Sequence, residues 1–179
     1  MKKVLVIHPE DPTTDMLQIV YSGKGYDVIR DPHVSDEEIV GQIKSHDKII
    51  MLGHGTPDGL LSWNRRTGEV RYVINDSHAE LLKTKETYSM WCNSDAFFER
   101  HGMKGFHSGM IISEQIEALM FGITSYNDEE VAATLSPLMF AMHDTLEMED
   151  LQEMQRIILE RYNATDPITR FNRRNILIL

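Results

Sequence analysis

The sequence is almost free of cysteine: Cys92 is the only one in 179 residues. A single thiol excludes an internal disulfide, and it excludes a zinc site built from several cysteines. Such cysteine usage is typical of proteins in a reducing compartment, so we expect a cytoplasmic location. A lone cysteine is most often a small buried apolar residue, but a thiol is also a potential nucleophile.

Basic residues are few as well, with 18 Lys and Arg against 28 Asp and Glu, and the net charge is −10. A chain of this charge repels the phosphates of nucleic acids and of anionic membranes. We therefore expect no nucleic-acid partner and no membrane partner. The composition, with 41% hydrophobic and 26% charged residues, is that of a globular protein.

Long hydrophobic runs, internal repeats and linkers rich in proline, glycine or serine are missing. No run reaches the ~18 apolar residues of a membrane span. The apolar run at residues 4–7 ends at His8, and it is shorter than the ~7–15 residues of a signal-peptide core. Length and composition together predict one domain over residues 1–179.

Short apolar runs alternate with helix signals in the first part of the chain. The runs at residues 4–7, 26–29 and 48–53 predict strands, because each is apolar in character and stops at or shortly before a proline or glycine: Pro9, Pro32 and Gly53. Between them, Asp11, Thr13 and Thr14 offer caps for a short helix, and a capping box at Ser35 opens a longer one. This alternation predicts a parallel sheet with right-handed crossovers.

The rest of the chain continues in the same way. Residues 60–63 and 69–74 predict a hairpin joined through residues 64–68, and residues 87–91 predict the next strand of the main sheet. Four more helices are expected: one from Ser77, one over residues 96–101, one from Ser113 to residue 119, and one from Asn127 to about residue 162 with a break at Ser136-Pro137. Residues 109–112 are expected to form a strand or an ordered loop, and residues 175–179 a last strand. Together they predict an α/β three-layer sandwich around a mostly parallel central sheet.

The segment from Lys48 to Gly55, K-I-I-M-L-G-H-G, organises the candidate site. Its apolar run predicts a strand buried on both faces, and His54 follows the carboxyl end of that strand between two glycines. In open α/β sheets, ligands bind at this end of the strands. Cys92 follows the next strand of the main sheet. If the two strands are neighbours, roughly 4.8 Å apart, the two side chains lie at the same edge of the sheet.

A cysteine beside a histidine is a chemically useful pair. The thiol is a poor nucleophile until it loses its proton, and a neighbouring imidazole can take that proton. The backbone N–H groups of Gly55 and Cys92 could hold the oxyanion that forms when a thiol attacks a carbonyl. His54 and Cys92 are therefore candidate catalytic residues, although a lone histidine after a strand is most often a hydrogen-bonded loop residue.

Three further histidines lie near the expected site. His8 ends the first strand at the same edge as His54, which makes it a candidate cleft residue. His101 and His107 could line the cleft or bind a metal, but their loop positions favour the surface. We predict no metal site from these residues.

The order of the pair along the chain, with histidine first and cysteine at the end of the next strand, resembles the caspase-like clan of cysteine peptidases. This clan includes caspases, gingipains, clostripain, legumain and separase. Its members commonly follow His-Gly with a turn and a small hairpin, as in H-G-T-P-D-G-L-L-S-W here, and place a helix before the cysteine strand, where residues 77–85 lie. The similarity covers about residues 1–122. The caspase motif is Q-A-C-x-G, whereas this chain has M-W-C-N-S, so the chain looks like a divergent relative on the gingipain and clostripain side.

The resemblance implies a caspase-like fold and a cysteine peptidase that hydrolyses peptide or protein substrates with a His54–Cys92 dyad and no cofactor. It also implies a pocket that selects a charged residue before the scissile bond, for which Asp95, Ser113 and Glu114 are candidates by location only. A second hypothesis is a catalytically inactive caspase-like domain that serves as an interaction or scaffold module. A third, a flavodoxin-like nucleotide- or effector-binding domain, is disfavoured because no G-x-G-x-x-G or P-loop motif follows any strand.

Overall fold

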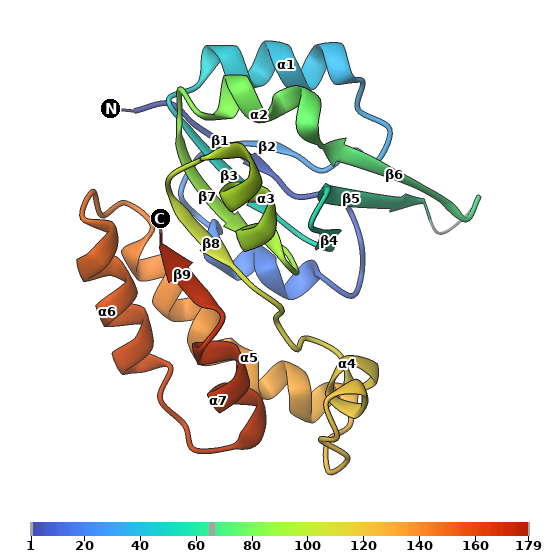
Figure 1. The fold of residues 1–179 in the computed structure, drawn as a ribbon, viewed down its shortest axis with the longest axis vertical. Coiled ribbons are helices and arrows are strands. Elements are labelled where there is room, and N and C mark those ends of the chain that lie inside the picture. The colour runs from blue at the N-terminus through green and yellow to red at the C-terminus, as the bar shows by residue number, and fades with distance from the viewer. Residues whose placement is uncertain (1, 65–66, 179) are drawn as a thin grey trace.

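A six-stranded sheet lies at the centre of the structure, a computed structural model that describes residues 2–64 and 67–178 (Figure 1). Across the sheet, the strands are β2 (Asp27–Ile29), β1 (Val4–Ile7), β3 (Lys48–Leu52), β7 (Glu86–Met90), β8 (Phe106–Ser108) and β9 (Ile176–Ile178). All neighbouring strands are parallel except β8 and β9, which are antiparallel. The prediction of an α/β protein with a mostly parallel central sheet is therefore confirmed.

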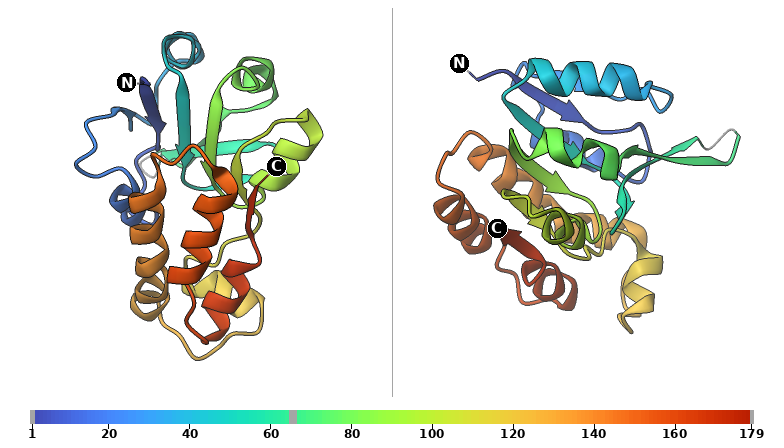
Figure 2. Two further views of the ribbon diagram at one scale, coloured as in Figure 1. Left: turned by 90° about the vertical axis from the view of Figure 1, so that its left-hand side faces the viewer. Right: turned by 45° about the horizontal axis from the view of Figure 1, so that its top comes forward.

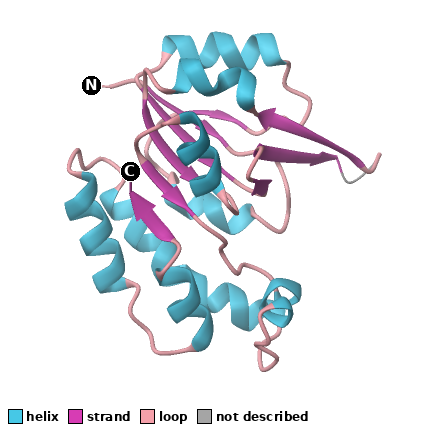
Figure 3. Ribbon diagram, in the orientation of Figure 1, coloured by secondary structure: helices cyan, strands magenta, loops and turns pink. Residues whose placement is uncertain are grey.

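A smaller, antiparallel sheet leaves the carboxyl end of β3 and projects to one side (Figure 3). It consists of β4 (Gly55–Thr56), β5 (Gly59–Asn64) and β6 (Glu69–Ile74). The sequence predicts the hairpin of β5 and β6, but it does not predict β4, because a two-residue strand carries no periodic signal. Arg65 and Arg66, which are expected in the connecting loop, lie outside the described residues.

Helices cover both faces of the main sheet. They are the 3-10 helix η1 (Asp15–Val20) and the α-helices α1 (Asp36–Ser45), α2 (Asp76–Leu82), α3 (Ser94–His101), α4 (Gln115–Met120), α5 (Asp128–Thr145), α6 (Leu151–Arg161) and α7 (Pro167–Arg173). Figure 2 shows α1 and α2 on one side of the sheet and α5 and α6 on the other, so the sheet is the middle of three layers. Within residues 2–64 and 67–178, no helix has the length and apolar character that crossing a membrane requires.

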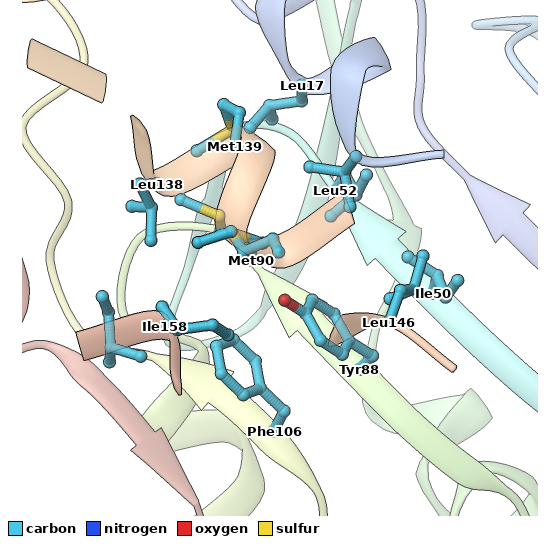
Figure 4. Close-up of a cluster of buried hydrophobic side chains, with 14 of the residues drawn as sticks. Leu17, Ile50, Leu52, Tyr88, Met90, Phe106, Leu138, Met139, Leu146 and Ile158 are labelled. Carbon is cyan, nitrogen blue, oxygen red and sulfur yellow. The ribbon is translucent and has the colours of Figure 1, made fainter. Parts of the chain in front are cut away.

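The alternation of side chains along each strand produces one hydrophobic core on either side of the sheet. In β3, Ile50 and Leu52 belong to the core on the side of α5 (Figure 4), whereas Ile49 and Met51 belong to the core on the side of α1 and α2. All five residues of β3 are buried. This is the two-sided burial that the uninterrupted apolar run predicts, and it fixes the point at which the chain leaves the sheet.

Helix α5 continues through Pro137, so the predicted break at Ser136-Pro137 is wrong. A proline inside a helix removes a hydrogen bond and costs roughly 3 kcal/mol. Leu135 and Leu138 on either side of it are buried in the core, and their burial offsets that cost. The chain instead breaks between α5 and α6, where the Asp150 side chain caps α6.

The fifth strand of the main sheet is β8, and residues 109–112, expected as a strand or an ordered loop, form a loop after it. Two polar residues of β8, His107 and Ser108, are buried. His107 stacks on Phe98, and the Ser108 N–H donates to Oγ of Ser94 at 2.9 Å. Because these two buried residues are polar, the strand contains no apolar run, and a prediction based on apolar runs misses it.

The helix starts agree with the sequence only in part. Ser35 caps α1 as predicted. The cap of α2 is Asn75 rather than Ser77, and the cap of α4 is Glu114 rather than Ser113. Several neighbouring polar residues can cap in these segments, so the sequence alone does not select one of them. Helix α7 is not predicted at all.

Candidate functional site

The strands β3 and β7 are neighbours in the sheet, as the proposed pairing of their ends requires. Leu52 and Met90, the last residues of the two strands, are paired, and the N–H of Gly53 donates to the Met90 carbonyl at 3.1 Å. His54 and Cys92 lie just beyond these positions. The sheet thus delivers both segments to the same edge.

His54 and Cys92 line the same cavity at this edge. Most of the other residues that line it are apolar. All of these other residues are Thr13, Thr14, Met16, Leu17, Gly53, Met90, Trp91, Ile111, Ser113, Leu135 and Met139. This cavity is small: its volume of about 30 Å³ is room for one or two water molecules. An adjoining cavity that His54 also lines has a volume of about 420 Å³, which is in the range of ligand sites.

The Cys92 side chain is half-buried, and its Sγ donates to the carbonyl of Ile111 at 3.5 Å. Burial raises the pKa of the Cys92 thiol to about 12, and the negative charges of Glu117 and Glu114 act in the same direction. A thiol with this pKa is protonated and unreactive at neutral pH. An attack by Cys92 therefore requires that its proton be removed at the moment of reaction.

His54 is held by the loop that follows β1. Its Nε2 lies 2.6 Å from Oγ1 of Thr13, and that hydroxyl donates to Oδ1 of Asp11 at 2.8 Å. Asp11 is only 4% exposed, so a buried carboxylate lies one hydroxyl group away from the imidazole. The sequence indicates only capping roles for Asp11 and Thr13. The signal that links them to the site is their position after the carboxyl end of β1, at the same edge as His54.

The two glycines beside the histidine have different structural roles. Gly53 has a φ of 139°, a conformation that favours glycine. Gly55 lies against Trp91, and a Cβ atom added to it would be 2.0 Å from Cδ1 of the indole. The indole N–H donates to the Thr56 carbonyl at 3.1 Å and fixes the small sheet to the segment that carries Cys92. The oxyanion role of the Gly55 and Cys92 N–H groups stays a prediction.

The turn after Cys92 contains no glycine. Asn93 has a φ of 65°, a left-handed conformation that asparagine adopts more readily than most residues, and its N–H donates to the Gly109 carbonyl at 3.1 Å. Ser94 occupies the position of the glycine in Q-A-C-x-G; it is fully buried, and its Oγ donates to the Ser108 carbonyl at 2.8 Å. The departure from the caspase motif is thus a residue that fixes α3 to β8.

Two of the three predicted substrate-binding residues lie beside the pair. Ser113 lines the cavity that contains His54 and Cys92. Glu114 lines two adjoining cavities, one of which it shares with His54. Asp95, in the first turn of α3, is not among the residues that line these three cavities.

Two other histidines near this edge are buried. The Nδ1 of His8 lies 3.0 Å from the Tyr21 hydroxyl, and its Nε2 lies 3.2 Å from Oγ1 of Thr14. Burial lowers the pKa of His8 to about 4, and the charge of Arg30 acts in the same direction. His107 is only 2% exposed, so the surface position expected for it is wrong. Among the residues that the structure describes, no group of three potential ligands could hold a metal ion.

No protein-family model matches the chain, and the comparison with curated proteins finds no match either. A functional proposal therefore depends on the geometry at this edge of the sheet. Its central residues are His54, Cys92, Thr13 and Asp11.

Proposed function

We propose that this protein is a cysteine peptidase, or a closely related thiol hydrolase, in which Cys92 is the nucleophile and His54 is the acid–base residue. One observation carries the proposal: the two side chains follow neighbouring parallel strands and line one cavity. A thiol and an imidazole at the edge where α/β proteins bind ligands are suited to acyl transfer.

The order of elements between the two residues supports a caspase-like arrangement. After β3 come His54 and Gly55, the small sheet of β4 to β6, helix α2, and then β7 with Cys92 beyond it. This is the order that the resemblance to the caspase-like clan implies. With Asn93 and Ser94 in place of the family's x-G, the chain would be a divergent member of that clan.

In the proposed reaction, His54 takes the proton of the Cys92 thiol while Sγ forms a bond to the carbonyl carbon of the substrate. The N–H groups of Gly55 and Cys92 donate to the oxyanion. The C–N bond then breaks, and the leaving amine receives its proton from His54. A water molecule that gives a proton to His54 hydrolyses the thioester, which releases the acid product and restores the thiol. The reaction requires no cofactor.

The protonated thiol fits a nucleophile that is activated only when substrate is bound. In the resting state the Sγ–H group is engaged with the Ile111 carbonyl, so proton transfer to His54 requires the Cys92 side chain to rotate. A thiol is a weak hydrogen-bond donor, and the loss of this bond costs little. The resting protein would therefore show low thiol reactivity toward small reagents.

The proposed substrate is a peptide or protein segment bound along the edge of the sheet. The larger cavity beside His54 has room for a substrate side chain, and its lining residues Leu61, Trp63 and Val70 suit an apolar one. Ser113 and Glu114 are half-buried and line these cavities, where they would contact a polar or basic side chain. We propose a cytoplasmic location on the basis of the cysteine content.

A second candidate function is that of a catalytically inactive interaction domain with the same arrangement. The observation that favours it is the Cys92 thiol itself, because a raised pKa and a hydrogen bond to a backbone carbonyl are typical of structural cysteines. This alternative predicts that Cys92 reacts neither with small thiol reagents nor with peptide-based ones.

Hydrolysis of an unfolded protein substrate, followed by mass spectrometry of the new termini, tests the proposed activity. We expect cleavage by the wild type and a loss of at least ~100-fold in Cys92→Ala and in His54→Ala, because each removes a group that reacts directly. His33→Ala changes an exposed histidine outside the cavity and should keep the wild-type rate. Unchanged cleavage by either dyad variant would contradict the proposal.

A further inference from the structure

His54 forms a hydrogen bond that takes no part in the proposed reaction. The Nε2 atom lies 2.6 Å from Oγ1 of Thr13, and Oγ1 lies 2.8 Å from Oδ1 of Asp11. A hydroxyl group has one proton to donate. A carboxylate can only accept, so the Thr13 proton goes to Asp11 and the hydroxyl oxygen must accept its second bond from His54.

This count determines where the imidazole carries its proton. Because the Thr13 hydroxyl oxygen accepts a hydrogen bond from Nε2 of His54, Nε2 bears the hydrogen and Nδ1 keeps its lone pair. We infer that Thr13 and Asp11 form a relay that holds His54 in the tautomer whose Nδ1 accepts the proton of the Cys92 thiol. The inference rests on the proposed function for its purpose, but it can be tested without any turnover.

The loop is built to hold this relay in place. The Thr13 N–H donates to the same Oδ1 of Asp11 at 3.0 Å, and the Thr14 N–H donates to the Asp11 carbonyl at 3.0 Å. Asp11 is almost completely buried, so its interactions are screened little by water. The segment from Asp11 to Thr14 therefore presents a fixed, polarised hydroxyl to the imidazole.

The relay also has a consequence for the proton transfer. When Nδ1 takes the thiol proton, the imidazole becomes a cation whose Nε2–H group still donates to Thr13. The Asp11 carboxylate stabilises that cation through the hydroxyl, because charge-assisted hydrogen bonds are stronger than neutral ones. The Thr13 proton stays with Thr13 throughout, and only the proton between Cys92, His54 and the leaving amine moves. Thr13 and Asp11 are thus positioning residues.

A purely structural role for the same residues makes a different prediction. The hydrogen bond from the Thr13 N–H to the Asp11 carboxylate closes a common local turn, which would form without any histidine nearby. If Asp11 and Thr13 served only to form this turn, removal of the Thr13 hydroxyl would leave the tautomer of His54 unchanged. The tautomer of His54 therefore separates the two roles.

Nuclear magnetic resonance of the full chain labelled with ¹⁵N-histidine measures this tautomer, and the spectrum of His54→Ala identifies the resonances. In the wild type we expect an Nε2–H tautomer with an Nε2 proton protected from exchange with water. Thr13→Val, which removes the hydroxyl at nearly constant volume, should lose that protected proton, and Thr13→Ser should restore it. In Asp11→Asn the proton signal should shift, because a neutral amide oxygen is a weaker acceptor than a carboxylate.

Thr124→Val changes an exposed threonine and is the matched control, which should leave the His54 signals unchanged. An Nδ1–H tautomer in the wild type, or the same protected proton in Thr13→Val, would overturn the relay, and an unchanged signal in Asp11→Asn would remove Asp11 from it. For peptide hydrolysis we expect a ~10-fold lower kcat/KM in Thr13→Val and recovery in Thr13→Ser. A tautomer that depends on Thr13 in a protein that cleaves no peptide would uphold the relay and contradict only the proposed activity.

Discussion

At the scale of single residues, burial sets the protonation of the side chains at the edge of the sheet. It raises the pKa of Cys92 to about 12 and lowers the pKa of His8 to about 4. Both shifts have the same cause, because an apolar environment disfavours the charged form of an acid and of a base alike. Both groups are therefore neutral at pH 7. The thiol would be activated by proton transfer to His54 rather than as part of an ion pair that exists beforehand.

Acid should destabilise the protein through His8. Its pKa is about 4 in the folded state, whereas its ordinary value of 6.5 applies in the unfolded chain. Between these pH values the unfolded chain binds a proton that the folded protein does not. Stability is thus full above pH 6.5 and falls as the pH drops toward 4, by about 3 kcal/mol from this residue.

Urea unfolding at about pH 7 and about pH 4 measures this loss of free energy. Protonation of carboxylates also weakens the fold in this range, so a variant is needed to isolate the histidine. His8→Gln does not titrate, and its amide can still form hydrogen bonds to Tyr21 and Thr14. We expect a smaller loss in His8→Gln than in the wild type. Equal losses would show that His8 does not control the acid stability.

At the scale of elements, one tryptophan fixes the two strand ends relative to each other. Trp91 directly precedes Cys92, packs on Gly55 and donates to the Thr56 carbonyl at 3.1 Å. Its ring also contacts Phe97 of α3 with ring centroids 5.7 Å apart. The small sheet after β3 and the helix after β7 are therefore both attached to the same side chain. This attachment holds the two halves of the proposed dyad at constant positions.

Gly55→Ala should disturb this attachment. The added Cβ would lie 2.0 Å from the Trp91 ring, so the indole or the small sheet must move. We expect the free energy of unfolding in urea to fall by about 1–3 kcal/mol, as for other overpacked sites. Gly41→Ala in α1 is the matched control: a Cβ there has no atom within 4 Å, and alanine stabilises a helix by about 0.5–1 kcal/mol relative to glycine. Equal effects of the two substitutions would contradict the packing of Gly55 on Trp91.

At the scale of the whole molecule, the sequence predicts the outline of the fold. The strands β1 and β3 are uninterrupted apolar runs, and short β-α-β connections leave few ways to arrange them in a sheet. The errors occur where packing overrides a local preference. Pro137 lies inside α5 because its neighbours are buried, and β8 contains the buried polar residues His107 and Ser108.

The candidate site is predictable from the sequence only in part. His54 and Cys92 are recognisable because each follows a buried strand, and the pairing of those strands brings the two segments together. Thr13, Asp11 and Glu117 reach the site from loops or short helices. The end of β1 places Asp11 and Thr13 at this edge. Their local sequence does not reveal the hydrogen bond between Thr13 and His54, nor does that of Glu117 reveal the effect of its charge on Cys92, because both depend on tertiary packing.

Modification of Cys92 by a peptide acyloxymethyl ketone tests most directly whether His54 and Cys92 act together. This reagent resembles a substrate and modifies a thiol that is activated in the site, and the mass of the intact protein reports the reaction. We predict that Cys92 of the wild type reacts at least ~10-fold faster than Cys92 of His54→Ala, whereas iodoacetamide reacts slowly with both proteins because the resting thiol is protonated. Equal rates with the peptide reagent in the wild type and in His54→Ala would contradict the proposed dyad.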